Sequence, residues 1–172
     1  IGSAAPDTAR AIIDVGGGEA TLVDDLIARG YRDITVLDIS QAAIDVAKDR
    51  LGPSQSSVNW VTGDITTVEL EAARYDVWHD RAVFHFLKRS EDRAAFVRQV
   101  ARSVKIGGHV IVATFGPDGP EKCSGLDVVR YDAEHLHSEF GPKFHLLDSV
   151  TELHETPWGA PQQFMYCFCR LG

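Results

Sequence analysis

Residues 12–20 join a short apolar run to three consecutive glycines, and this stretch constrains the fold more than any other part of the chain. The run is rich in β-branched residues and predicts a buried strand. The turn that follows is made of Gly16, Gly17 and Gly18. Without a Cβ, this backbone turns sharply and approaches a ligand closely. Apolar residues then recur at helical spacing up to Gly30, so a strand, glycine loop and helix are expected, as at the nucleotide-type site of a parallel sheet.

Two residues beside this loop sharpen the prediction. Asp14 interrupts the apolar strand two positions before the first glycine, and a buried carboxylate is costly unless it has a partner. Thr21 stands where a dinucleotide-binding fingerprint requires glycine or alanine. The loop therefore departs from the nicotinamide-binding pattern. A tight turn without a ligand is the alternative for the glycines alone.

Strand-like and helix-like segments alternate along the chain. After the first strand, further strands are expected at 33–38, 58–62, 75–80 and 109–115. Helices are expected between them, with Ser40, Ser90 and Asp132 as caps, and residues 116–129 are expected to form a loop. Two β-rich runs, 144–155 and 163–170, finish the chain. This order predicts an α/β fold with a doubly wound, mostly parallel seven-stranded sheet, helices on both faces and a C-terminal antiparallel β-hairpin.

Length and charge limit the function classes. The 172 residues suffice for one domain, 1–172, and the start at Ile1 leads us to expect a missing N-terminal segment. A net charge of −8 argues against a nucleic-acid partner. No apolar run approaches the roughly 20 residues of a membrane span. The sequence leaves the oligomeric state open.

The cysteines indicate a compartment. Cys123, Cys167 and Cys169 form an odd, sparse set rather than a disulfide framework, so a reducing cytoplasm is expected. Cys167 and Cys169 fall on one face of the last strand, where we expect two small buried core residues. His135 and His137 are two positions apart and do not share a helix face, so no metal site is expected.

A series of motifs now resembles the class I S-adenosylmethionine-dependent methyltransferases over about residues 11–170. The series is Asp14-Val-Gly-Gly-Gly, Asp38-Ile-Ser, Gly63-Asp64-Ile, Tyr75-Asp-Val-Trp-His-Asp80 and Lys105-Ile-Gly-Gly-His-Val-Ile-Val. Asp38 follows Gly18 by 20 residues, the spacing that brings a carboxylate beside a ribose. A capping or surface aspartate is the alternative there. The resemblance implies a Rossmann-like fold and S-adenosylmethionine as cofactor, with S-adenosylhomocysteine as product.

The resemblance also implies roles for individual residues. The glycine loop passes beneath the methionine part of the cofactor, and Asp14 suits its ammonium group. Asp38 suits the ribose hydroxyls, and Asp64 suits the adenine amine. Ile39 and Ile65 would sandwich the adenine ring. The remaining residues assigned to the cofactor site are Asp80 and Arg81.

Residues 78–83 are similar to the Trp-Asp-Arg-Gly-Ala segment of thiopurine methyltransferases, with His79 inserted and Ala82 in the glycine place. This implies a small-molecule acceptor, with a thiol among the classes. Methyl transfer needs mainly alignment and exclusion of water, with a base where the acceptor must lose a proton. The candidate bases are Asp80 and His85, with His79 as a third. The alternatives are an ion pair with Arg81 or a cap for Asp80, and a structural role for His85.

The acceptor pocket is expected near residues 80–86 and 115–117 and near Trp158, although these aromatic residues are equally suited to a core.

Three other functions stay open. One is a protein-lysine methyltransferase. The others are an NAD-binding Rossmann domain and a module that binds S-adenosylmethionine or S-adenosylhomocysteine without turnover.

Overall fold

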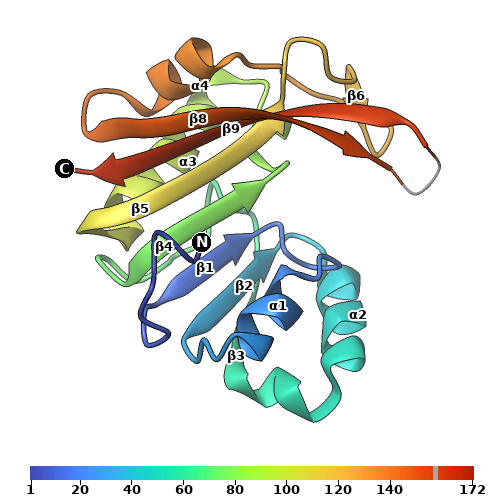
Figure 1. Ribbon diagram of the computed structural model, residues 1–172, viewed down its shortest axis with the longest axis vertical. Helices are drawn as coiled ribbons and strands as arrows, with labels where there is room; N and C mark the ends of the chain where they lie inside the picture. The colour runs from blue at the N-terminus through green and yellow to red at the C-terminus, as the bar shows by residue number, and fades with distance from the viewer. Residues whose placement is uncertain (157–158) are drawn as a thin grey trace.

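A computed structural model describes residues 1–156 and 159–172, and its centre is one twisted sheet of seven strands (Figure 1). The strand order is β3-β2-β1-β4-β5-β9-β8. The five strands from β3 to β5 in this order run parallel to one another, whereas β9 pairs antiparallel with both β5 and β8. The bounds are β1 Ile12–Val15, β2 Ile34–Asp38, β3 Val58–Thr62, β4 Tyr75–Arg81, β5 Val104–Phe115, β8 Phe144–Glu155 and β9 Pro161–Leu171. The predicted mostly parallel sheet with a C-terminal antiparallel hairpin is confirmed.

Within the described residues, four helices lie between the strands along the chain, and β3 and β4 are joined without one. In Figure 1, α1 lies in front of the sheet, and α3 lies behind it. The helices are α1 Leu22–Ala28, α2 Gln41–Leu51, α3 Ser90–Ser103 and α4 Ala133–Phe140, and the 3₁₀ turns are η1 Gly52–Ser57 and η2 Phe84–Phe86. Because the crossovers place helices on both faces, the parallel strands are buried and read as apolar runs.

Local sequence determines most helix ends. The Ser40 hydroxyl accepts a hydrogen bond from Ala43 N at 3.2 Å, and an Asp132 carboxylate oxygen accepts one from His135 N at 2.8 Å, so both predicted caps are confirmed. The prediction for Ser90 is wrong. Ser90 is the first helical residue of α3, and Arg89, with extended backbone, occupies the cap position. The serine lies one position too late to offer its hydroxyl to the first turn.

In the described structure, two large apolar clusters hold the layers together, and a third, smaller one surrounds Phe115 and Phe164. One lies on the α3 and α4 side and is centred on aromatic residues that include Trp78, Phe84 and Phe96, none of them exposed. The other lies on the α1 side and packs Val23 and Leu26 against β1, β2 and β4. Cys167 and Cys169 are each 2% exposed, which confirms them as core residues.

Some boundaries differ from the prediction. Strand β5 begins at Val104 rather than at residue 109, because Val104 already pairs with Tyr75 on β4. The pairing then shifts register and resumes at His109, and Gly107 within this irregular stretch has φ +80°. The expected loop at 116–129 contains a small hairpin, β6 Lys122–Cys123 and β7 Leu126–Asp127. Within the described ranges, no helix is long and apolar enough to cross a membrane. Trp158, expected near the acceptor pocket, lies outside the described residues.

Candidate cofactor site

The carboxyl ends of β1, β2 and β3 meet at one edge of the sheet, where the order of strands places the predicted motifs side by side. Gly16 N donates to Leu37 O at 2.7 Å, which joins the glycine loop to β2. Gly63 N donates to Asp38 O at 3.0 Å, which joins β2 to the turn after β3. Ligands of open α/β sheets bind at this kind of edge.

The three glycines are required by what surrounds them. Gly16 has φ +74°, in the left-handed region that favours glycine. A Cβ at Gly17 would lie 2.3 Å from an oxygen of Asp14. A Cβ at Gly18 would lie 2.8 Å from an oxygen of Asp38. The loop backbone therefore rests directly on two carboxylates, a close approach that side chains would prevent.

Asp38 anchors the loop and keeps capacity for a ligand. One of its oxygens accepts from Gly18 N at 3.0 Å, and the other accepts from Ser40 N at 2.8 Å. A carboxylate has about four acceptor positions, so the half-buried group can accept further hydrogen bonds. Beside it, the Ile39 side chain is 72% exposed. An exposed apolar side chain next to this carboxylate suits a flat ring attached to a diol.

The turn after β3 holds the other two residues assigned to adenine. Asp64 is exposed, and one of its oxygens accepts from both Thr66 N and the Thr66 hydroxyl, at 2.8 and 2.7 Å. Ile65 is only 5% exposed and belongs to the core cluster on the α3 side. Ile39 therefore offers a ligand far more apolar surface than Ile65 does.

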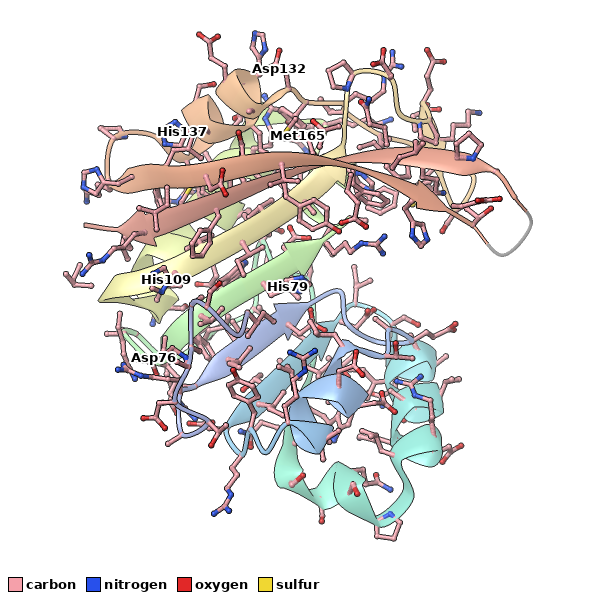
Figure 2. The ribbon with its side chains drawn as sticks, in the orientation of Figure 1. Asp76, His79, His109, Asp132, His137 and Met165 are labelled. Atoms are coloured by element: carbon pink, nitrogen blue, oxygen red, sulfur yellow. The ribbon has the colours of Figure 1, made fainter. Side chains whose placement is uncertain are left out.

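Asp14 pairs with His79, which the sequence had indicated only as a candidate base. Asp14 is 2% exposed, and its Oδ1 lies 2.7 Å from His79 Nδ1. Among the described residues, its Oδ2 is buried without a hydrogen-bond partner. The two residues are direct neighbours in the parallel pairing of β1 with β4, and Figure 2 shows His79 on β4 beside the end of β1. Strand order and register are the signals that could have revealed this pair.

Asp80 has the contacts of a turn cap. It is fully buried, and its two oxygens accept from Val83 N at 2.8 Å and Phe84 N at 2.9 Å. Burial raises the pKa of Asp80 to about 7, although the two backbone hydrogen bonds oppose the shift. Its contacts fix the turn after β4. The use of Asp80 as a base or as a cofactor ligand stays a prediction.

Arg81 points away from Asp80. Its Nε donates to the Tyr166 hydroxyl at 3.1 Å, and its guanidinium lies 4.2 Å from the centre of the Phe164 ring. Ala82 follows with φ +70°, a conformation that costs energy for a residue with a Cβ. This is the position at which the thiopurine methyltransferase segment has glycine, and the strained turn lies between the cofactor loop and β9.

His85 is packed as a core residue. It is fully buried between the rings of Phe86 and Phe115, at centroid distances of 4.6 and 4.9 Å. Its Nδ1 accepts from Phe115 N at 3.3 Å, while its Nε2 has no partner within the part of the chain described. Burial lowers the pKa of His85 to about 4. A neutral, enclosed imidazole supports the structural alternative, and its role as a base stays a prediction.

Two adjoining cavities open on the α1 side of the sheet. One, of about 390 Å³, lies against the glycine loop and is lined by Asp14, Val15, Gly16, Gly17, Ala20, Thr21, Leu22, Asp25, His79 and Arg81. The other, of about 340 Å³, shares Leu22, Asp25 and His79 with the first and reaches Ile111 and Tyr166. Across residues 1–156 and 159–172, no group of three or more His, Cys, Asp or Glu side chains is arranged to hold a metal ion.

The residues of this site are suited to bind S-adenosylmethionine. Asp14 has a buried carboxylate oxygen without a hydrogen-bond partner among residues 1–156 and 159–172. The glycine loop leaves no room for side chains, and the exposed Ile39 stands beside the carboxylate of Asp38. A family model described as a methyltransferase domain matches residues 13–112. The chain belongs to this methyltransferase family.

Curated relatives agree with this assignment. The ubiquinone biosynthesis O-methyltransferase of Alkalilimnicola ehrlichii is 35% identical over 105 residues, which cover 61% of this chain and 41% of the relative. The eEF1A lysine and N-terminal methyltransferase of Danio rerio is 23% identical over 139 residues, covering 79% of this chain and 19% of the relative. The methyltransferase chain thus spans about two fifths or less of the length of these relatives.

Solved structures show the same fold. A SAM-dependent methyltransferase of Methanosarcina mazei superposes with a TM-score of 0.77 at 14% identity, covering 96% of this chain and 93% of that one. The 1,6-didemethyltoxoflavin-N1-methyltransferase of Burkholderia thailandensis, solved with S-adenosylhomocysteine, has a TM-score of 0.71 at 16% identity, covering 95% and 71%. The fold is therefore that of class I S-adenosylmethionine-dependent methyltransferases. The resemblance to thiopurine methyltransferases stays a prediction.

Proposed function

We propose that this methyltransferase moves a methyl group from S-adenosylmethionine to a small-molecule acceptor. The observation that carries the proposal is the Gly18–Asp38 contact beside the exposed Ile39. It combines a backbone approach, a carboxylate and an apolar surface at one edge of the sheet, as an adenosine group requires. The cofactor supplies a methyl group that is already activated by its sulfonium charge.

The chain's own residues bind and orient the cofactor in this proposal. Asp38 accepts the ribose hydroxyls, Ile39 covers one face of the adenine, and Asp64 accepts from the adenine amine through its second oxygen. Asp14 supplies negative charge for the ammonium group. Gly17 allows the loop to lie against that carboxylate. Binding at several points lets orientation supply much of the rate acceleration.

The region after β4 supports the proposal of a small acceptor. Phe115 and Phe164 form a small apolar cluster there with Ala82, Cys123 and Tyr166, which suits a small acceptor. Asp80 and His85 are both engaged by backbone groups. An acceptor that ionises without enzymatic help, such as an acidic thiol, therefore fits better than an alcohol. The O-methyltransferase relatives make phenols the next class to test.

A protein lysine is the second candidate acceptor. The Danio rerio relative named as a lysine and N-terminal methyltransferase matches 79% of this chain. The net charge of −8 also suits a basic peptide.

The cytoplasm is the proposed compartment, supported by three cysteines that are free in the described structure.

The test is an acceptor screen. Purified protein is incubated with S-adenosylmethionine and separate panels of thiols, phenols and lysine-containing peptides, and the release of S-adenosylhomocysteine is measured. Turnover with a thiol supports the proposal, and turnover with phenols alone would move the acceptor to oxygen. Turnover restricted to peptides would replace the small molecule with a protein.

A further inference from the structure

The pair of Asp14 and His79 has features that an ordinary core contact does not need. Asp14 is 2% exposed and its Oδ2 is buried without a partner in the described part of the chain. A buried polar atom without a partner requires an explanation. This oxygen faces Gly17, since a Cβ on that glycine would lie 2.3 Å from it. The unsatisfied acceptor therefore lies directly beneath the loop that binds the ligand.

His79 determines how that carboxylate is held. Its Nδ1 lies 2.7 Å from Asp14 Oδ1, and its side chain is 14% exposed. An ionised carboxylate only accepts hydrogen bonds, so the Nδ1 of His79 carries the proton and donates. The imidazole fixes one oxygen of Asp14 and leaves the other for a cation. His79 also lines the cavity that contains Gly16 and Gly17.

We propose that His79 is a positioning residue for the amino-acid end of the cofactor: its Nδ1–H orients the Asp14 carboxylate, which supplies the negative charge for the ligand's ammonium group. The inference rests on the proposed function, because it assumes that the glycine loop binds a molecule with an α-amino acid group. It gives His79 a role in ligand selectivity, acting through Asp14. The ligand class that this subsite selects is a zwitterionic amino acid joined to a nucleoside.

Two ligands that differ in the amino-acid group test the proposal. S-adenosylhomocysteine carries this group, whereas 5′-methylthioadenosine keeps the nucleoside and lacks it. Binding of both is measured by calorimetry for the wild type, His79→Leu and His79→Asn. Leucine removes the donor, and the asparagine amide can occupy the position of Nδ1–H. His109→Asn is the matched control, because His109 lies on the neighbouring strand β5 and stacks on Phe168 (Figure 2).

We expect His79→Leu to weaken S-adenosylhomocysteine binding about tenfold, as for one lost hydrogen bond to a charged group, and to leave methylthioadenosine binding unchanged. His79→Asn retains the selectivity, and so does the control.

Other outcomes separate the hypotheses. If the wild type binds neither ligand, the proposed function itself fails. If it binds both and His79→Leu weakens them equally, the pair is only structural and the inference is overturned. Should His79→Leu not fold, His79→Asn decides alone, because a folded variant that keeps the amide donor and still loses the preference for S-adenosylhomocysteine also overturns the inference.

Discussion

The buried carboxyl of Asp80 gives a prediction whose size follows from the structure. Unfolded aspartate has a pKa of about 4, whereas burial raises the pKa of folded Asp80 to about 7. Between pH 5 and 6 the folded protein therefore holds about one proton more than the unfolded chain, and this excess falls to about one half at pH 7. Asp80 contributes stability that is fully present below about pH 4 and is lost as pH rises through 7. The loss of stability is at most about 1.4 kcal/mol per pH unit, and it totals about 3 kcal/mol between pH 5 and pH 8.

The variant Asp80→Asn removes this titration. Its amide oxygen still accepts from one of the two backbone donors, Val83 N or Phe84 N, and the other donor loses its acceptor. We therefore expect the stability difference between variant and wild type to shift by about 3 kcal/mol in the variant's favour from pH 5 to pH 8. His85, whose pKa burial lowers to about 4, favours folding as pH rises. It is present in both proteins, so its contribution cancels in the difference.

The assay is urea unfolding followed by circular dichroism at pH 5 and pH 8, with Asp45→Asn on the exposed face of α2 as control. The control should show no comparable shift with pH. A constant stability difference between Asp80→Asn and wild type at both pH values would refute the argument from burial. If the variant folds and binds S-adenosylhomocysteine normally but loses turnover, Asp80 acts as a base.

Three further substitutions test the site. Asp38→Ala should weaken S-adenosylhomocysteine binding by about 1–3 kcal/mol in calorimetry, because ribose loses a charged acceptor; unchanged affinity would refute the ribose assignment. Gly17→Ala should weaken it at least about tenfold, because the new Cβ displaces Asp14; Gly2→Ala, which has open space, is the control. Ala82→Gly should stabilise the fold by about 1 kcal/mol in urea unfolding by relieving its positive φ; a destabilised variant would contradict this strain.

Local patterns predicted most of the fold. The cap at Ser40 and the helix end at Gly30 depend on neighbouring residues, and both occur as expected: the Ser40 hydroxyl accepts from Ala43 N, and Gly30 follows the helix with φ +88°. The Ser90 cap is wrong by one position, since sequence alone does not determine where the backbone leaves extended conformation. The alternation of elements predicted the sheet, because a parallel crossover needs a covering helix.

The site was predicted less completely, because its contacts cross the sheet. Asp14 and His79 are 65 positions apart and meet only because β1 lies beside β4. The sequence also did not show which side chains are buried. Ile39 and Ile65 each follow an aspartate at or just after the end of a strand, yet Ile39 is 72% exposed and Ile65 only 5%. The sequence could not show that backbone donors occupy Asp80, since that depends on the turn after β4.

The most direct measurement is calorimetric titration of the purified methyltransferase chain with S-adenosylhomocysteine, with NADH as the control ligand. The account predicts saturable binding of S-adenosylhomocysteine and none of NADH, because the glycine loop, Asp38 and Ile39 form an adenosine site with a carboxylate, Asp14, beneath the amino-acid end. Binding of NADH without S-adenosylhomocysteine, or of neither, would contradict the assignment of this sheet edge as a methyl-donor site.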